Sequence, residues 1–264
     1  MTFLTSFFTT VDGEWFVPNE ECCGPWDPAA CHAGPPTAMI ARALERVLPS
    51  ARLTRITVDL DRPVPMAGFR VVAEVVRSGR TVSATRASLL DTDGKERVRA
   101  VGSHLAIGDL GSVATTAHRV ATLAESAPGG FPIERGEGTG RGFPDAVEIR
   151  YPPGEGPGLG PTTMWMRAIP LLPDEEPTPF QRICPLADCS NAMSRNAAPT
   201  EMQFMNTDLT ITLHRDPVGE WLGSQAVGRW EPTGIGFADA LLFDDVGVVG
   251  RACQTLVLRR PLGS

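Results

Sequence analysis

The sequence predicts an α+β fold, in which two tandem repeats each combine one long helix with an antiparallel sheet. Apolar residues at helical spacing over 38–48 are followed by several segments with strand-like alternation. The pattern then recurs, because the run 56–62 matches 209–215 and the run 89–94 matches 242–247, both at an offset of 153 residues. Any two antiparallel sheets share some alternation, but a constant offset over more than thirty residues favours a duplicated unit.

The first half begins with a predicted strand pair. Two short apolar runs, 7–11 and 13–18, flank a turn at Asp12-Gly13. A loop rich in Cys, Gly and Pro follows, and the segment 32–37, His-Ala-Gly-Pro-Pro-Thr, leads into the helix. Prolines suit the first turn of a helix because their missing N–H would have no partner there in any case. Pro49 ends the helical run.

The chain divides into two units and a connection. Between 108 and 142 the residues Ala, Ser, Thr and Gly dominate, and the run 136–140, Gly-Glu-Gly-Thr-Gly, is typical of a flexible loop. We therefore expect an N-terminal repeat at 1–107, a linker at 108–146 and a C-terminal repeat at 147–264. The strands of the first repeat are predicted at 56–60, 69–76, 81–90 and 98–107.

Charge and hydropathy exclude several classes of partner. A net charge of −7 argues against nucleic acid, because binding to phosphates needs a basic surface. No apolar run approaches the ~20 residues of a membrane span, and no basic amphipathic stretch is present, so we expect no membrane partner. The N-terminus lacks a basic stretch followed by an apolar core, which predicts a cytoplasmic protein.

Metal and cofactor motifs are missing from the sequence. The six cysteines form no CxxC pair and no histidine stands at zinc-finger spacing, so we expect free thiols and no metal. Neither GxGxxG nor a phosphate-binding GxxxxGK motif occurs, so no cofactor is expected. Ser190 and Ser194 lack a GxSxG turn, which argues against a serine hydrolase.

The two repeats differ at three polar positions of the second half. At the common offset, Asp188 corresponds to Pro35, Asn206 to Leu53 and Gln254 to Val101. Burying an unpaired amide costs roughly 1–3 kcal/mol, so packing does not explain polar residues at positions that are apolar in the sister repeat. The plainer interpretation, that Asp188 faces solvent from its helix-like segment 180–193, stays open at this point.

A carboxylate with two neutral amides suits the activation of water. Asp188 would take the proton, while Asn206 and Gln254 would hold the water molecule. The helix start at 32–34, His-Ala-Gly, exists only in the first half. These differences predict one composite site per chain, to which each half contributes different parts.

These residues resemble a known family. A helix that starts at His-x-Gly, a long antiparallel sheet and a duplicate with Asp on its helix are similar to the double-hotdog acyl-CoA thioesterases, in particular the bacterial acyl-CoA thioesterase II type and its actinobacterial thioesterase-like relatives. The run 214–221 resembles the family's His-Arg-Pro and Glu-Trp motifs, and 234–236 and 251–254 fit its second repeat. The resemblance covers nearly the whole chain apart from the linker. It implies a double hotdog that hydrolyses acyl-CoA or acyl-carrier thioesters.

The resemblance also implies roles for individual residues. The family's catalytic Asp and Gln fall on Asp188 and Gln254, and its catalytic Thr falls on Asn206, with Thr207 beside it. Backbone N–H groups near Gly34 would stabilise the oxyanion, because helix N-termini carry unpaired donors. His32 would shape the helix start or move a proton. Asn206 and Ala33 stand where the family has Thr and Gly, and we expect these two differences to affect substrate range and catalytic efficiency.

Several alternatives remain open from the sequence. Asp188 could attack the thioester directly and form an anhydride. The protein could instead bind acyl chains without turnover, or act on a carrier-bound thioester in a biosynthetic cluster. A hotdog hydratase would need a His beside the acid, and the Asp188 segment has none. The outer faces of such a sheet predict a homo-oligomer, either a dimer or a tetramer.

Overall fold

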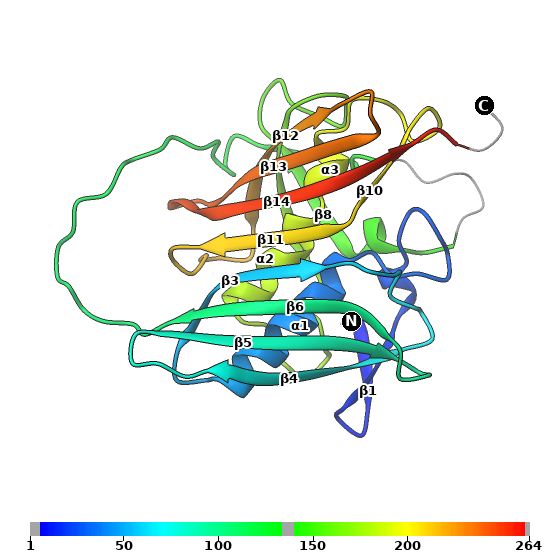
Figure 1. The fold of residues 1–264 in the computed structure, drawn as a ribbon. Helices are drawn as coiled ribbons and strands as arrows, with labels where there is room; N and C mark the ends of the chain where they lie inside the picture. Colours follow the sequence, from blue (N-terminus) through cyan, green and yellow to red (C-terminus); the bar gives the residue numbers. More distant parts are fainter. Residues whose placement is uncertain (1–5, 134–139, 262–264) are drawn as a thin grey trace.

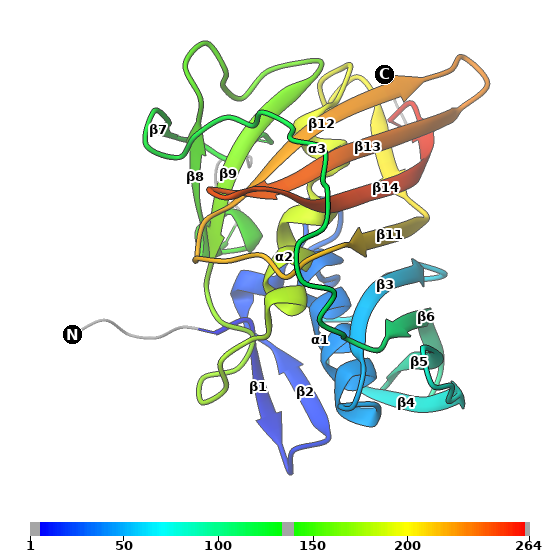
Figure 2. The same cartoon turned by 90° about the vertical axis from the view of Figure 1, so that its left-hand side faces the viewer.

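One large antiparallel sheet dominates the fold and curves around the helices. The computed structural model describes residues 6–133 and 140–261. Figures 1 and 2 show the helices enclosed on the concave side of the sheet. The predicted α+β class is therefore confirmed, with a large sheet and few helices.

Fourteen strands of the described residues form this sheet. From one edge to the middle, the strands are β1 (Phe8–Val11), β2 (Trp15–Pro18), β4 (Phe69–Arg77), β5 (Val82–Asp91), β6 (Glu96–Leu105) and β3 (Arg52–Asp59). The sheet continues through β11 (Asp208–Leu213), β14 (Gly247–Arg259), β13 (Ile235–Asp244), β12 (Leu222–Trp230), β9 (Thr162–Ala168), β8 (Val147–Tyr151) and β7 (Ala127–Gly129). The short strand β10 (Gln203–Asn206) pairs with β14 beside this path.

The two halves of the chain join at β3 and β11, which pair antiparallel. Outward from this joint, the order is β6, β5, β4, β2 and β1 on one side and β14, β13, β12, β9 and β8 on the other. Apart from β7 and β10, the strands of the two halves follow one another in the same order when counted along the chain. The joint also leaves neither β3 nor β11 as an open edge.

Two helices pack against each other inside the curve of the sheet: α1 (Gly34–Val47) and α2 (Pro179–Asp188). The helix predicted over 38–48 is confirmed, with prolines in its first turn. The Thr178 hydroxyl accepts the N–H of Gln181 at 3.3 Å and so caps the start of α2. The helix-like segment 180–193 is interrupted at Cys189, after which the short α3 (Ser190–Met193) follows. Within the described residues, no helix is long and apolar enough to cross a membrane.

The segment between the halves contributes to the fold instead of only connecting it. Residues 127–129 form the edge strand β7, which pairs with β8. The 3-10 helix η2 (Phe143–Ala146) begins with the fully buried Phe143. Of the Gly-rich run 136–140, residues 136–139 lie outside the described residues.

The larger of two hydrophobic clusters draws on both halves. Its buried side chains come from α1, α2 and the inner face of the sheet, and Ile40, Ile56, Ile183 and Ile211 are each fully buried within it. Alternation along β3 and β11 points every second residue inward, as the sequence pattern predicts. Asp188 lies at the end of α2, one of the helices packed in this core.

Candidate active site

Asp188 is the last residue of α2 and lies beside the start of α1. Its side chain is 4 % exposed. The two helices approach closely here, because a Cβ on Gly34 would lie 2.8 Å from the Cα of Pro185 and 3.3 Å from the Cβ of Asp188. A glycine at position 34 is thus required by helix packing, in addition to the oxyanion role that the sequence analysis expects of the backbone N–H groups here.

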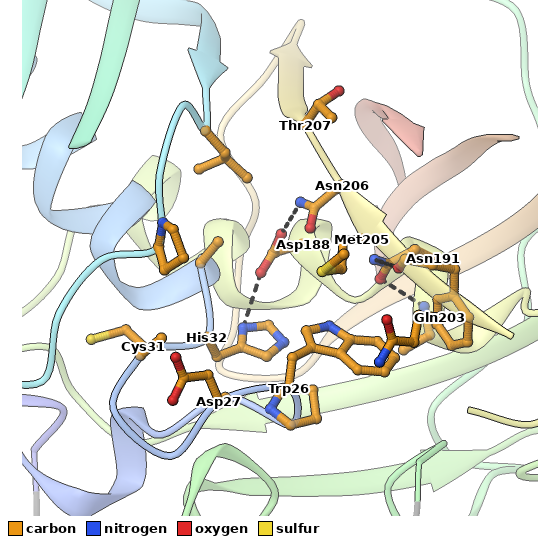
Figure 3. Close-up of a pocket in the computed structure, with 18 of the residues that line it drawn as sticks. Trp26, Asp27, Cys31, His32, Asp188, Asn191, Gln203, Met205, Asn206 and Thr207 are labelled. Atoms are coloured by element: carbon orange, nitrogen blue, oxygen red, sulfur yellow. Dashed lines mark hydrogen bonds and ion pairs between the residues drawn. The ribbon is translucent and has the colours of Figure 1, made fainter. Parts of the chain in front are cut away.

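Three side chains direct donors at the Asp188 carboxylate, and Figure 3 shows two of them, Asn206 and His32. The Asn206 amide donates to Oδ1 at 2.8 Å, and the Gln254 amide donates to the same oxygen at 3.2 Å. The His32 Nδ1 lies 3.0 Å from Oδ2. An ionised carboxylate is acceptor-only, so this arrangement uses it as the common acceptor of donors from β10, β14 and the start of α1. The structure thus brings together the three polar residues identified by the repeat comparison, and adds His32.

Both ends of the Gln254 side-chain amide form hydrogen bonds with other protein groups. Its Nε2 also donates to the Asp188 carbonyl at 3.0 Å, and its Oε1 accepts the Asn191 N–H at 3.1 Å. The side chain is fully buried and does not line the cavity. Gln254, which was expected to hold the water, therefore binds the end of α2 and the Asp188 carboxylate instead. Asn206, in contrast, lines the cavity.

His32 is fixed by an aromatic ring that the sequence analysis missed. The imidazole stacks on Phe143 with centroids 3.8 Å apart and ring planes at 8°. Phe143 stacks in turn on Phe7 at 5.9 Å. The sequence does contain a signal for this burial, because Phe143 is a large apolar residue in a stretch otherwise rich in Gly and polar residues.

Two contacts of His32 Nδ1 exclude each other. The nitrogen lies 3.3 Å from the Gly34 N–H and 3.0 Å from Asp188 Oδ2. One ring nitrogen cannot accept the first and donate to the second. In the tautomer with a proton on Nδ1, this nitrogen donates to the carboxylate, and the Gly34 N–H is without Nδ1 as its acceptor.

Cys189 completes a Cys-His-Asp array, with its Sγ 4.0 Å from His32 Nε2. Such an array suggests a nucleophilic thiol. Burial and the charge of Asp188, however, raise the pKa of the Cys189 thiol well above its usual range. The thiol is fully buried, donates to the Pro185 carbonyl at 3.3 Å and does not line the cavity. The geometry thus argues against Cys189 as the nucleophile.

The cavity beside Asp188 has a volume of about 480 Å³. Asp188, His32, Ala33, Asn206 and Thr207 line it. The Thr207 side chain points away from Asp188 (Figure 3), and its hydroxyl lies 3.3 Å from the Thr255 carbonyl. Among the described residues, no group of three or more His, Cys, Asp or Glu side chains could hold a metal ion.

Comparison with known proteins gives matches over both halves. The family model for the acyl-CoA thioesterase N-terminal domain matches residues 23–105, and the model for the C-terminal domain matches residues 119–258. A search of curated proteins finds no match.

Three solved structures illustrate the similarity of fold. A protein described as a thioesterase from Novosphingobium aromaticivorans DSM 12444 has a TM-score of 0.72 at 18 % identity, over 96 % of this chain and 98 % of its own. A conserved protein with hot dog fold from Alicyclobacillus acidocaldarius has a TM-score of 0.71 at 15 % identity, over 96 % of both chains. Acyl-CoA thioesterase II TesB2 from Mycobacterium marinum has a TM-score of 0.63 at 17 % identity, over 97 % of this chain and 96 % of its own.

The sheet around its helices, together with these structures, defines a protein of the hotdog fold. With domain models matching both halves, the chain belongs to the acyl-CoA thioesterase family, so the resemblance expected from the sequence is confirmed.

Proposed function

We propose that the protein hydrolyses the thioester of an acyl-CoA, or of an acyl group on a carrier, with water activated by Asp188. One observation carries the proposal: a buried carboxylate lines a cavity of about 480 Å³ and is held there by three separate elements. A protein that only binds acyl chains has no need for a carboxylate at this depth, because an isolated buried charge is costly.

The proposed reaction begins with water in the cavity between Asp188 and Asn206. Asp188 takes a proton as the water oxygen bonds to the thioester carbon. The oxyanion is stabilised by backbone N–H groups at the start of α1, at Ala33 and Gly34. The carbon–sulfur bond then breaks, and the proton held by Asp188 passes to the departing thiolate. Gln254 and His32 keep the carboxylate oriented throughout.

The decisive experiment is Asp188→Asn, which keeps the size of the side chain and removes the base. Thiol release from hexanoyl-CoA should fall about 10²–10⁴-fold, the usual contribution of a positioned acid–base group. Asp109→Asn, on an exposed loop, is the matched control. If Asp188→Asn hydrolyses thioesters as well as the parent, the binding function takes precedence.

Direct attack by Asp188 is the alternative within the same function. It would form a mixed anhydride between Asp188 and the acyl group, with the thiol released in the first step. A single turnover in ¹⁸O-labelled water separates the two routes. Attack by water puts the label in the acid product, whereas hydrolysis of the anhydride at the Asp188 carbonyl puts it in Asp188.

A second candidate function follows from the His32–Asp188 contact. The sequence analysis found no His on the Asp188 helix, yet His32 reaches Asp188 from the start of the other helix, at 3.0 Å. An acid with a His is what hydration of an enoyl thioester would need. Loss of the enoyl absorbance of crotonyl-CoA without thiol release would favour this function over hydrolysis.

We further propose that the two halves are hotdog repeats at 1–107 and 147–264, connected by 108–146. The shared strand order supports this division. We also propose a homo-oligomer, because the outer sheet face carries exposed Val72 and Val101. Light scattering that gives a monomer at micromolar concentration would contradict the oligomer.

A further inference from the structure

The cavity at Asp188 has two ends with different chemistry. On one side, Thr207 and residues 60–64 line it, including the exposed Arg62. On the other side, Trp26, Phe131, Ile133 and Phe204 line it, and we call this group the aromatic arm. Figure 3 shows Thr207 and Trp26 on opposite sides of Asp188. A thioester bound at Asp188 therefore sends one of its two groups into each end.

The end with Arg62 suits the thiol half of the substrate. Both CoA and a carrier-bound pantetheine bring phosphate, which pairs well with guanidinium groups. Asp61 at this end is already paired with Arg99 at 2.8 Å, which reduces its repulsion of a phosphate. The acyl group is then left to the aromatic arm.

Behind the aromatic arm, Phe204 is tightly packed against other side chains. Phe204 is fully buried, and its ring meets Trp26 edge to face with centroids 5.2 Å apart. Trp230 supports Phe204 from a centroid distance of 5.3 Å, and Leu256 packs in the same buried cluster. A long straight acyl chain directed at Phe204 would meet this packed cluster, whereas a compact group would stop short of it.

The aromatic rings of the arm favour an acyl group that itself contains a ring. Aromatic side chains attract another ring in edge-to-face or offset-stacked positions, beyond the area they bury. Trp26 is partly exposed, so part of its ring is open to the cavity. Gln203 and Arg259 also line this end of the cavity.

We propose that the acyl group is a compact aromatic acid, of benzoyl or phenylacetyl size, and that Trp26 selects it. The proposal rests on the proposed thioester chemistry for its catalytic test, but not for its binding test. Hydrolysis of benzoyl-, phenylacetyl-, hexanoyl- and palmitoyl-CoA should show a kcat/KM for the aryl substrates at least ~10-fold above the others, the discrimination that one well-fitted pocket provides.

The matched variants are Trp26→Leu and Trp26→Phe. Leu removes the ring and should reduce the aryl preference about 10-fold, while Phe should retain most of it. Trp221→Leu is the control, because the Trp221 ring contacts the guanidinium groups of Arg150 and Arg167 and does not line the cavity. A preference for palmitoyl-CoA in the parent, or an equal loss on all substrates in Trp26→Leu, would overturn the proposal.

Binding of thioethers tests the acyl preference without catalysis. S-benzyl-CoA and S-hexyl-CoA cannot be hydrolysed and share the CoA group, so the difference between their dissociation constants reports the fit of the benzyl or hexyl group. The parent should bind S-benzyl-CoA more tightly, and Trp26→Leu should lose that difference. If the thioether preference holds but no thioester is hydrolysed, the proposed reaction fails and the aromatic arm stands. If thioesters are hydrolysed with no aryl preference in either assay, the reaction stands and the aromatic arm fails.

Discussion

Thr57 and Thr210 face each other directly in the β3–β11 ladder, and the Thr210 hydroxyl donates to the Thr57 hydroxyl at 3.1 Å. They are 153 residues apart, which is the offset of the sequence repeat. Equivalent positions of the two halves thus meet at the joint, as they do on the axis of a symmetric dimer. This relationship explains how one chain places different residues of two similar units around one cavity.

The same offset relates two buried turn carboxylates, Asp91 and Asp244. Burial by itself would raise the pKa of Asp244, but Arg215 and backbone N–H groups lower it below its ordinary value overall. For Asp91, burial is likewise outweighed by the Lys95 N–H and by Arg97, so its pKa is also lowered. Each half therefore fixes its corresponding turn with a charged acceptor.

These carboxylates predict a loss of stability in acid. Because the pKa of Asp244 is lower in the folded chain than in the unfolded chain, its contribution is present above the unfolded value of about 4. It is lost as the pH falls through the folded value. Asp244→Asn should therefore lower the free energy of unfolding by roughly 1–3 kcal/mol at pH 7 and by less at pH 4. Urea unfolding at both pH values tests this, with the exposed Asp245→Asn as control. An equal loss at both pH values would contradict it.

Variants of Gln254 and Asn206 should distinguish a residue that positions Asp188 from one that contacts the water. Gln254→Ala removes bonds to the Asp188 carbonyl, the Asp188 carboxylate and the Asn191 N–H, so we expect a lower melting temperature together with a lower kcat. Asn206→Ala removes one bond at the cavity and should lower kcat with a smaller change in melting temperature. Both losses of activity should be smaller than that of Asp188→Asn. Equal melting temperatures for the two variants would contradict the positioning role of Gln254.

Cys189 should be dispensable in spite of its place beside His32. Cys189→Ala removes the thiol, and we expect kcat/KM to stay within about 3-fold of the parent because the buried, protonated thiol is a poor nucleophile. Mass spectrometry of the enzyme during turnover should show no acyl adduct on the thiol. A large loss of activity in Cys189→Ala, with an acyl adduct on the parent, would reverse the assignment.

Much of this fold was predictable because it depends on local patterns. The spacing of apolar residues and Pro49 located α1, and the alternation located β3 to β6. The candidate carboxylate came from comparing the repeats, since Asp188 stands where the sister repeat has Pro35. Both kinds of information are carried by sequence spacing alone.

The remaining parts of the site depend on contacts between distant segments. His32 reaches Asp188 only because α1 and α2 cross at Gly34, and no periodicity encodes that crossing. The side chain of Gln254 lies beside Asp188, but its orientation depends on the Asn191 N–H, which is available only where α3 begins. Phe143 lies in a stretch interpreted as a linker, and its burial follows from packing with Phe7.

Phe143 is the residue that most directly tests how His32 is held. Its ring covers one face of the imidazole at 3.8 Å and restricts rotation of that ring, so Nδ1 stays directed at Asp188. Phe143→Leu keeps most of the volume and removes the flat face. An aromatic contact of this kind contributes about 0.5–1.5 kcal/mol, so we expect kcat/KM to fall roughly 2- to 12-fold. The pH profile of kcat/KM should change as well, because the His32–Asp188 contact is disturbed.

Phe243→Leu is the matched control, since Phe243 is equally buried but packs edge-on against Trp165, outside the cavity. Both variants should lose stability, and only Phe143→Leu should change the pH profile. If the two variants lose activity equally and neither profile moves, Phe143 serves packing alone.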